Sequence, residues 1–333
     1  MKRIAINGLG RIGRLILREY LKSGYGDLEI VAVNDLVAID NLAYLLKFDS
    51  VHGRAPFDVS VSGGNLKLGD KLIPVYSEKD PENLPWKELG VDIVLEASGA
   101  FRKHKDASKH LKAGARRVLI SAPADDPDKT LVMGVNIQEF DPNSHFIISN
   151  ASCTTNSLAP TLKVLLDNFG IEKAHVTTVH GYTISQSMVD GAKRNMIRGR
   201  AGAVNIIPTS TGADKATVEV LPQLKGKLAA IALRVPVVDG AITDISVELS
   251  KDVDIKAVND AFIAAANGKM KGILAYSDEE LASTDIIGDP NSAIVHGLST
   301  NVIQGRFVKL HVWYDNELAY AKRCLDMVQV LPL

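Results

Sequence analysis

The sequence predicts an α/β protein in which a doubly wound parallel sheet is followed by an α+β domain with a largely antiparallel sheet. Three observations support this fold class. A strand, a glycine-rich turn, an amphipathic helix and a second strand open the chain and form a βαβ unit. Further short apolar runs then alternate with a helical pattern. Beyond about residue 152, strands of alternating apolar and polar residues replace the continuous apolar runs.

The first half of the chain contains the elements of the parallel sheet. The opening strand reads RIAIN, the turn GLGRIG, the helix extends to about Leu21, and the next strand reads LEIVAVN. The later strands read VDIVLEA, RVLISA and HFIISN, and the helical pattern DASKHLKAG separates the first two. Because parallel strands need crossover connections, this alternation extends the sheet to about Ala151.

The second half begins with a helix and continues with strands. Leucines at helical spacing predict a helix over residues 153–169, and strands follow in HVTTVHGYT, IALRVPV and ITDISVEL. Between residues 181 and 205 the periodicity disappears and glycine, arginine and lysine accumulate, which indicates a long functional loop. Residues 316–330 have a helical pattern.

These elements define two domains. Residues 1–151 form the first, residues 152–315 form the second, and the C-terminal helix within residues 316–333 packs back onto the first domain.

Composition excludes several classes of function. The 333 residues carry 38 basic and 39 acidic side chains, so the global charge favours neither a nucleic-acid partner nor an anionic membrane. No run approaches a membrane span, and the first residues do not resemble a secretory leader, so we expect a cytoplasmic protein. The only cysteines, Cys153 and Cys324, cannot make a disulfide framework or a multi-cysteine zinc site, and no metal site is predicted.

The glycine-rich turn predicts a dinucleotide site in a Rossmann-type domain. Gly8, Gly10 and Gly13 follow a strand and open a helix, where a backbone without side chains can approach a pyrophosphate. Asp35, at the end of the second strand, has the spacing of the acidic residue that accepts hydrogen bonds from a ribose 2′-hydroxyl and repels a 2′-phosphate. NAD is therefore favoured over NADP. The alternatives are glycines that serve packing alone and an aspartate that only caps a turn.

Cys153 is the candidate nucleophile. Strand HFIIS runs through Asn150, Ala151 and Ser152 into a helix, which places the thiol in the first turn, where free amides and the helix dipole stabilise a thiolate. The alternative for an isolated cysteine is a small buried apolar residue, and this is our interpretation of Cys324.

Along essentially its whole length the chain resembles the phosphorylating glyceraldehyde-3-phosphate dehydrogenases of bacterial type. The matching segments keep the order and spacing of that family: AINGLGRIGR, FDSVHG, ISAPA, NASCTTN, VTTVHGYT, NIIPTSTGADKA, ALRVP and WYDNE. The resemblance implies oxidation of D-glyceraldehyde 3-phosphate with NAD and phosphate to 1,3-bisphosphoglycerate and NADH, in glycolysis or gluconeogenesis, by a cytoplasmic homotetramer.

The resemblance also assigns the catalytic residues. It makes Cys153 the nucleophile that carries the acyl group as a thioester and His180 the general base, a role for which a near-neutral pKa is suited. Thr183 and Arg234 would bind the phosphate of the substrate. The residues implied to shape the pocket for inorganic phosphate are Ser152, Thr154, Arg198, Thr211 and Gly212.

The same resemblance extends the cofactor site. Besides the three glycines and Asp35, it implies Arg11 and Ile12 at the pyrophosphate, Ser121 beside the dinucleotide and Asn316 at the nicotinamide carboxamide. From the residues alone, Arg198 could belong to a solvated basic loop or to a salt bridge between subunits, and Asn316 could be a helix cap.

The sequence departs from the family pattern in three places. Ser157 replaces a second cysteine common after CTTN. The segment that follows Asn316 contains Leu318 and Ala319 where relatives commonly have a tryptophan or threonine followed by glycine, so Leu318 is a packing change. Gly191 and Ala192 stand where NAD-specific relatives often have a proline, which leaves use of NADP open.

Two other functions remain as alternatives. An erythrose-4-phosphate dehydrogenase would keep the cysteine and histidine but change the inorganic-phosphate pocket, whereas this chain retains TSTGADKA there. A non-catalytic binding protein on the same fold would have no need to retain nucleophile, base and anion-binding residues together.

Overall fold

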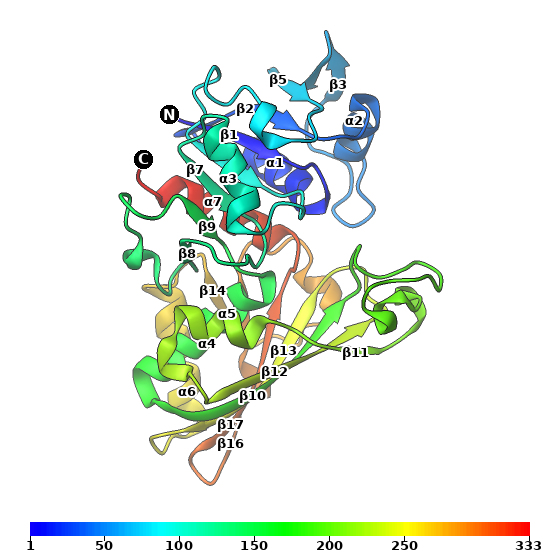
Figure 1. The fold of residues 1–333 in the computed structure, drawn as a ribbon. Coiled ribbons are helices and arrows are strands. Elements are labelled where there is room, and N and C mark those ends of the chain that lie inside the picture. Colours follow the sequence, from blue (N-terminus) through cyan, green and yellow to red (C-terminus); the bar gives the residue numbers. More distant parts are fainter. The chain divides into compact units, whose positions relative to one another are not determined.

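The computed structural model describes residues 1–333, and contacts between residues divide them into two compact units. The first unit comprises residues 1–131, 138–151 and 321–333, and the second comprises residues 132–137 and 152–320. Each unit is built on its own sheet, with the elements labelled in Figure 1. The predicted α/β class, with a parallel-rich sheet and a second, largely antiparallel one, is confirmed.

The sheet of the first unit has nine strands in the order β3-β4-β5-β2-β1-β6-β7-β9-β8. All neighbours from β5 to β8 in this order are parallel, whereas β3, β4 and β5 form an antiparallel edge that the sequence analysis did not predict. The strands are β1 (Lys2–Asn7), β2 (Leu28–Asn34), β3 (Val59–Ser62), β4 (Asn65–Leu68), β5 (Lys71–Tyr76), β6 (Ile93–Glu96), β7 (Arg117–Ile120), β8 (Lys129–Thr130) and β9 (Ile147–Ser149).

Helices α1 (Arg11–Ser23), α2 (Ile39–Lys47) and α3 (His104–Lys112) belong to the first unit, as does most of α7 (Leu318–Val330). The Lys2 side chain donates hydrogen bonds to the carbonyl oxygens of Val328 (3.0 Å) and Leu331 (2.6 Å). Because the last carbonyls of a helix have no partner within it, this ammonium joins the end of α7 to the first strand.

The sheet of the second unit has eight strands in the order β11-β12-β10-β13-β17-β15-β14, with β16 paired to β17. Most pairs are antiparallel, as expected of a largely antiparallel sheet, and β10 with β12 and β14 with β15 are the parallel exceptions. The strands are β10 (Ile171–Gly181), β11 (Ile207–Thr209), β12 (Leu228–Val235), β13 (Ala241–Leu249), β14 (Leu274–Ser277), β15 (Ala293–His296), β16 (Asn301–Ile303) and β17 (Phe307–Tyr314).

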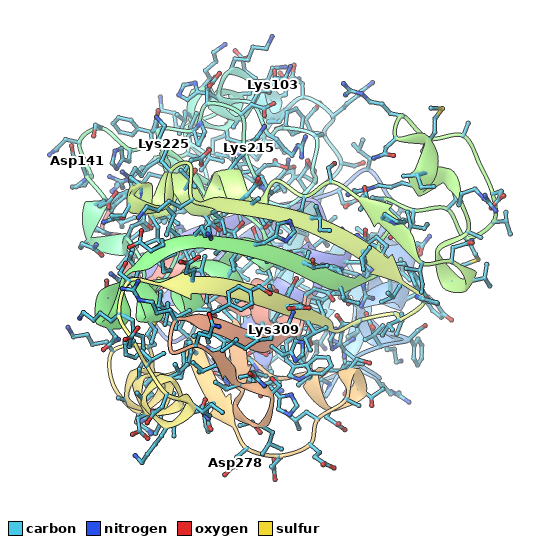
Figure 2. The ribbon with its side chains drawn as sticks, turned by 90° about the horizontal axis from the view of Figure 1, so that it is seen from below. Lys103, Asp141, Lys215, Lys225, Asp278 and Lys309 are labelled. Carbon is cyan, nitrogen blue, oxygen red and sulfur yellow. The ribbon has the colours of Figure 1, made fainter.

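One face of this second sheet is buried and the other is half-exposed. Buried and half-buried residues alternate strictly along β13, which fits a sheet with one face on the core. Figure 2 shows the sheet from its half-exposed side, where Lys309 of β17 lies and forms an ion pair with Asp244 of β13. Helix α4 (Cys153–Phe169) packs against β13, β15 and β17, and α5 (Ala213–Val220) and α6 (Ile255–Asn267) complete the unit.

Two boundaries differ from those expected from the pattern. The last helix begins at Leu318 and not at Asn316, because an Asp315 carboxylate oxygen accepts the backbone N–H groups of Glu317 (2.7 Å) and Leu318 (2.8 Å). Residues 132–137 lie in the second unit, where Gly134 packs closely against Met270 and Ile273. No helix has the length and apolar character required to cross a membrane.

Candidate active site

The turn that leads into α4 presents Cys153. Strand β9 ends at Ser149, and Ala151 then adopts a left-handed backbone conformation with φ 53°, although it is fully buried and is not a glycine. Such a conformation costs roughly 1–2 kcal/mol and persists where the surroundings enforce it. Ser152 follows as the N-cap of α4, and its hydroxyl accepts the Thr155 N–H at 3.0 Å. Cys153 is consequently the first residue of the helix.

His180 lies beside this thiol. The residue is near the end of β10, is buried, and holds its Nε2 atom 3.6 Å from the Cys153 sulfur. The structure therefore brings together the two residues assigned as nucleophile and base, which are 27 positions apart in the sequence.

The other ring nitrogen of His180 determines whether Nε2 can act as a base. Nδ1 lies 2.7 Å from the carbonyl oxygen of Gly181 and 2.6 Å from Nη1 of Arg234, which faces His180 from β12. A carbonyl only accepts hydrogen bonds and a guanidinium only donates them, so one protonation state of Nδ1 cannot serve both. When Nδ1 carries the proton and donates it to Gly181, the Nε2 lone pair faces Cys153.

The surroundings keep the imidazole neutral. Burial of the ring, the positive charge of Arg234 and the more distant charge of Arg198 lower the pKa of His180 to about 3, against an opposing hydrogen bond to Gly181. At neutral pH the ring is thus neutral, with one nitrogen available to accept a proton, and the near-neutral pKa expected for this base from the sequence is wrong.

The Cys153 thiol is affected by opposing influences. Burial of the sulfur raises its pKa, while the charge of Arg234 and hydrogen bonds with Thr154 lower it. Burial has the larger effect on the thiol pKa. The expectation of a stabilised thiolate, which came from the position of Cys153 at the start of a helix, did not include this effect. A neutral thiol next to a neutral histidine base is the arrangement that results.

Tyr314 is a site residue that the sequence analysis quoted only within the WYDNE segment. Its hydroxyl lies 3.0 Å from Oγ1 of Thr154 and 2.8 Å from Oγ1 of Thr178, inside the protein. Burial raises the pKa of Tyr314, so the hydroxyl stays protonated. The side chain of Thr154, assigned to a phosphate pocket, faces this hydroxyl in the structure.

The remaining residues assigned to anion binding lie in the second unit. Arg198 donates from Nε to Thr209 Oγ1 at 3.1 Å and from Nη2 to the Ser210 carbonyl at 3.2 Å.

Thr211 Oγ1 accepts the Ala213 N–H at 3.2 Å, and Gly212 is the N-cap of α5. Thr183 lies at the start of the long loop, with its hydroxyl 2.8 Å from that of Ser185.

A cleft of about 710 Å³ lies in the first unit, at the carboxyl ends of β1, β2 and β6. Of the residues assigned to the cofactor, Gly8, Gly10 and Asp35 line it. Residues that the sequence analysis did not assign also line it, namely Asn7, Asn34, Leu36, Glu78, Lys79, Asp80, Ala97, Ser98, Ala100, Phe101 and Lys109. Asn7 and Asn34 could have been suspected, because each ends a strand next to an assigned residue.

The glycine turn fits a dinucleotide because it has no room for side chains. Gly8 has φ 96°, and a Cβ atom on Gly13 would lie 1.9 Å from the Gly8 carbonyl oxygen. The two carboxylate oxygens of Asp35 accept the backbone N–H groups of Leu9 (2.6 Å) and Val37 (2.9 Å), which fixes the carboxylate beside the turn. The turn, the helix start and the acidic side chain have the arrangement expected of a site for a pyrophosphate and an adenosine ribose.

Other assigned cofactor residues have protein partners. Ile12 lies in the first turn of α1, and Arg11 there forms an ion pair with Asp49. Ser121 donates its hydroxyl to the Glu96 carbonyl at 3.0 Å. Asn316 is buried, and its Oδ1 atom has no hydrogen-bond partner in the protein, which leaves an acceptor for a ligand.

Comparison with known proteins gives matches over nearly the whole chain. A family model described as glyceraldehyde 3-phosphate dehydrogenase, NAD binding domain, matches residues 2–104, and one described as the C-terminal domain of the same enzyme matches residues 152–316. A glyceraldehyde-3-phosphate dehydrogenase of Geobacillus stearothermophilus is 53% identical over 325 residues, covering 98% of this chain and 96% of the relative. That of Streptomyces coelicolor is 52% identical over 326 residues (98% and 97%), and glyceraldehyde-3-phosphate dehydrogenase 1 of Bacillus subtilis is 50% identical over 325 residues (98% and 96%).

The different burial of the two cysteines predicts selective labelling. Residue Cys153 keeps part of its surface exposed, although burial of its sulfur raises the thiol pKa, whereas Cys324 is fully buried. We expect one equivalent of iodoacetamide to alkylate Cys153 and to leave Cys324 unmodified, as measured by peptide mass spectrometry. The Cys324→Ala variant should be alkylated at the same rate as the wild type. Labelling of Cys324 before Cys153 would contradict the structure.

The pair formed by Arg11 and Asp49 predicts an acid-dependent loss of stability. Burial alone would raise the pKa of Asp49, but hydrogen bonds from His52, Arg11 and Val51 lower it from 3.8 to about 2. This stabilisation is complete above about pH 4 and is lost as the pH falls through about 2. Asp49→Asn should therefore lower the free energy of unfolding by about 2 kcal/mol at pH 7.

Urea unfolding of wild type and Asp49→Asn at pH 7 and pH 3 measures this effect. The difference in free energy of unfolding between the two proteins should be smaller at pH 3 than at pH 7. As a control, substitution of the exposed Asp58 by Asn should leave the free energy of unfolding unchanged at both pH values. A difference that is the same at both pH values would show that the ionised carboxylate is not the stabilising group.

Proposed function

The chain belongs to the glyceraldehyde-3-phosphate dehydrogenase family, and we propose that Cys153 and His180 carry out the phosphorylating oxidation of D-glyceraldehyde 3-phosphate by this protein. The observation that supports this assignment most directly is the 3.6 Å contact between the Cys153 sulfur and Nε2 of a neutral His180. NAD is the cofactor of the family's N-terminal domain.

The first half of the reaction forms a thioester. The Cys153 sulfur attacks the aldehyde carbon while His180 Nε2 takes the thiol proton, and the imidazolium returns this proton to the alkoxide oxygen to give a hemithioacetal. His180 then removes the same hydroxyl proton, and the electron pair re-forms the carbonyl as hydride leaves the carbon. When bound, NAD accepts that hydride. The acyl group remains on the Cys153 sulfur.

The second half releases the product. An oxygen of inorganic phosphate attacks the thioester carbon, the carbon–sulfur bond breaks, and the acyl phosphate leaves. The Cys153 thiolate recovers a proton from the imidazolium of His180, which restores the initial state. Without phosphate the thioester would persist or react slowly with water.

We assign two anion pockets to the same unit. Arg234 and Thr183 would hold the phosphate of the substrate, and Ser152, Thr154, Arg198, Thr211 and Gly212 would shape the pocket for inorganic phosphate. Arg234 and Arg198 both lower the pKa of His180, so both charges act at this site. Gly212 caps α5 without a side chain, and amides of a first helical turn bind anions.

We assign Gly8, Gly10, Arg11, Ile12, Gly13, Asp35, Ser121 and Asn316 to the cofactor. Gly8, Gly10 and Asp35 line the cleft, and Gly13 allows the close turn. The unpartnered Oδ1 of Asn316 would accept the amide hydrogen of the carboxamide and so fix which face of the ring receives hydride.

We also propose a homotetramer in the cytoplasm. Large apolar side chains are exposed along residues 184–206, where Ile184, Met188 and Met196 are each more than 85% exposed. An apolar loop of this kind is typical of an interface between subunits. Neither cysteine forms a disulfide bond, which fits a reducing compartment.

The mechanism predicts that turnover needs a phosphate-like anion. We expect the purified protein to reduce NAD with glyceraldehyde 3-phosphate only when phosphate or arsenate is present, as followed by absorbance of NADH. Cys153→Ser should abolish turnover, and His180→Asn should lower kcat by roughly 10²–10⁴-fold. Equal turnover without either anion would favour a hydrolytic relative that uses erythrose 4-phosphate, and a fully active serine variant would exclude the thioester.

The position of Asp35 predicts a preference for NAD. A carboxylate already fixed by two backbone amides would face a 2′-phosphate at close range, which is electrostatically unfavourable. We expect kcat/KM with NAD to exceed that with NADP, and Asp35→Ser to reduce the ratio by about tenfold or more. A wild-type preference for NADP would contradict this assignment.

A further inference from the structure

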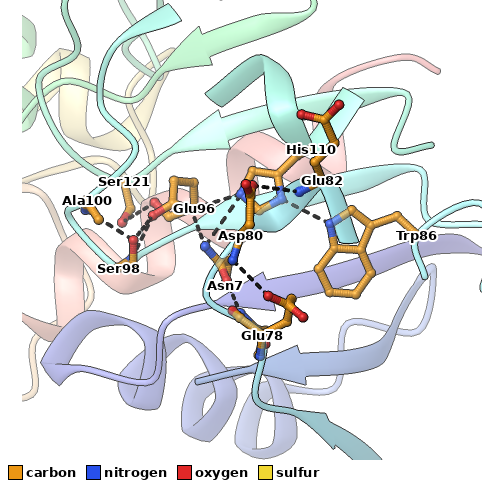
Figure 3. A network of polar contacts seen from close by, with 11 residues as sticks. Asn7, Glu78, Asp80, Glu82, Trp86, Glu96, Ser98, Ala100, His110 and Ser121 are labelled. Atoms are coloured by element: carbon orange, nitrogen blue, oxygen red, sulfur yellow. Dashed lines mark hydrogen bonds and ion pairs between the residues drawn. The ribbon is translucent and has the colours of Figure 1, made fainter. Parts of the chain in front are cut away.

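Figure 3 shows a buried network of polar side chains in the first unit, and this network includes Asn7, which also lines the cleft. It connects Trp86, His110 of α3, Glu96 at the end of β6 and Asn7 at the end of β1. All four side chains are nearly or fully buried. Buried polar groups are costly unless they are fully hydrogen-bonded, so the arrangement of these partners requires an explanation.

The chemistry of the side chains fixes the position of each proton. The indole N–H of Trp86 can only donate, and it points to His110 Nδ1 at 3.0 Å. The neutral ring therefore carries its proton on Nε2, which donates to Glu96 Oε2 at 3.0 Å. Hydrogen bonds thus run in one direction, from the indole through the imidazole to the carboxylate.

Both oxygens of the Glu96 carboxylate are used. Oε2 accepts from His110 and from Asn7 Nδ2 at 2.5 Å. Oε1 accepts the backbone N–H of Ser98 at 2.8 Å and also the Ser98 hydroxyl. The carboxylate consequently joins two strand ends that form the wall of the cleft, since Asn7 and Ser98 both line it.

The glycine turn packs against the backbone of Ser98. A Cβ atom on Gly8 would lie 2.5 Å from Cα and N of Ser98, so the turn is packed directly on this backbone. Any movement of Ser98 would move the wall against which Gly8 rests. Phe101, another residue of the cleft, packs edge-on to the His110 ring, with the centroids 6.0 Å apart.

The network continues along the cleft on the other side of Asn7. Asn7 Oδ1 accepts from Asn34 Nδ2 at 2.7 Å, and Asn34 also exchanges hydrogen bonds with the backbone of Glu78 (2.8 and 2.9 Å). One chain of hydrogen bonds thus crosses the carboxyl ends of β6, β1 and β2.

We propose that Glu96, oriented by His110 and Trp86, is a positioning residue for NAD. Its carboxylate holds Ser98 and Asn7 in place, and these residues set the geometry of the glycine turn before the cofactor binds. The inference rests on the family's NAD-binding domain as the premise. Preorganisation of this kind affects cofactor affinity and leaves the chemistry of the thiol untouched.

Variants at two positions of the network test the proposal by calorimetric titration of the full-length protein with NAD. Glu96→Gln removes an acceptor and His110→Leu removes both ring nitrogens, and each should raise the Kd for NAD at least about tenfold. His110→Gln retains an acceptor and a donor, and we expect its Kd within about threefold of the wild type. Glu29→Gln changes a partly exposed carboxylate in the same unit and should have no effect.

Steady-state kinetics separate a positioning role from a general loss of structure. At saturating NAD, kcat and the KM for glyceraldehyde 3-phosphate of the folded variants should stay within about twofold of the wild type. If Glu96→Gln and His110→Leu do not fold, Trp86→Phe, which keeps an aromatic ring and removes only the N–H, should still raise the Kd for NAD about threefold or more.

Unchanged NAD affinity in folded variants would overturn the proposal. An equal loss of NAD affinity in His110→Leu and His110→Gln would overturn it as well. So would an increase in the KM for the aldehyde that parallels the increase in the Kd for NAD. If the wild-type protein does not bind NAD, the cofactor assignment itself is wrong. If the wild type binds NAD and the variants bind it equally well, only the role of the network is wrong.

Discussion

The chemistry that we propose for this protein depends on the burial of one thiol against one imidazole. The Cys153 sulfur and His180 Nε2 lie 3.6 Å apart because a strained turn at Ala151 ends β9 and begins α4 next to the last residues of β10. Burial disfavours charge on both groups, raising the pKa of the thiol and lowering that of the imidazole. In the proposed mechanism, proton transfer between them would be coupled to the attack of sulfur on the aldehyde.

Arg234 has two effects on this pair. Its charge lowers the pKa of both Cys153 and His180, which favours the thiolate and disfavours the imidazolium. Its Nη1 atom donates to the Gly181 carbonyl at 2.9 Å, the same oxygen that His180 Nδ1 approaches. A phosphate that binds this guanidinium would reduce its effect on the ring, so the substrate's own charge would influence the base that acts on it.

Much of the fold and part of the site followed from local patterns. The leucines at helical spacing, the alternation along β13 and the continuous apolar runs of the first half each identified their elements, because each pattern matches a single backbone period. The glycine turn and Asp35 were predicted from a motif of nearby residues with a fixed spacing, and Gly8, Gly10 and Asp35 line one cleft in the structure. The parallel pairing of β10 with β12 was not predicted, since alternation shows which face is buried but not which strand is the neighbour.

The rest of the site depended on three-dimensional proximity. Nothing local to His180 distinguished it from the other histidines, and only the family resemblance selected it. Tyr314 and the network around Glu96 were missed because their members come from separate elements and bear no common motif. The raised thiol pKa was missed because a helix start is visible in the sequence, whereas burial of the sulfur is a property of the folded chain.

Neutron crystallography of the ligand-free protein at neutral pH would test the central claim most directly, because it locates the deuterium on each ring nitrogen of His180. The structure predicts a single deuteron on Nδ1, directed at the Gly181 carbonyl, and a bare Nε2 facing a protonated Cys153. A deuteron on Nε2, with Nδ1 accepting from Arg234, or deuterons on both nitrogens beside a bare sulfur, would contradict it.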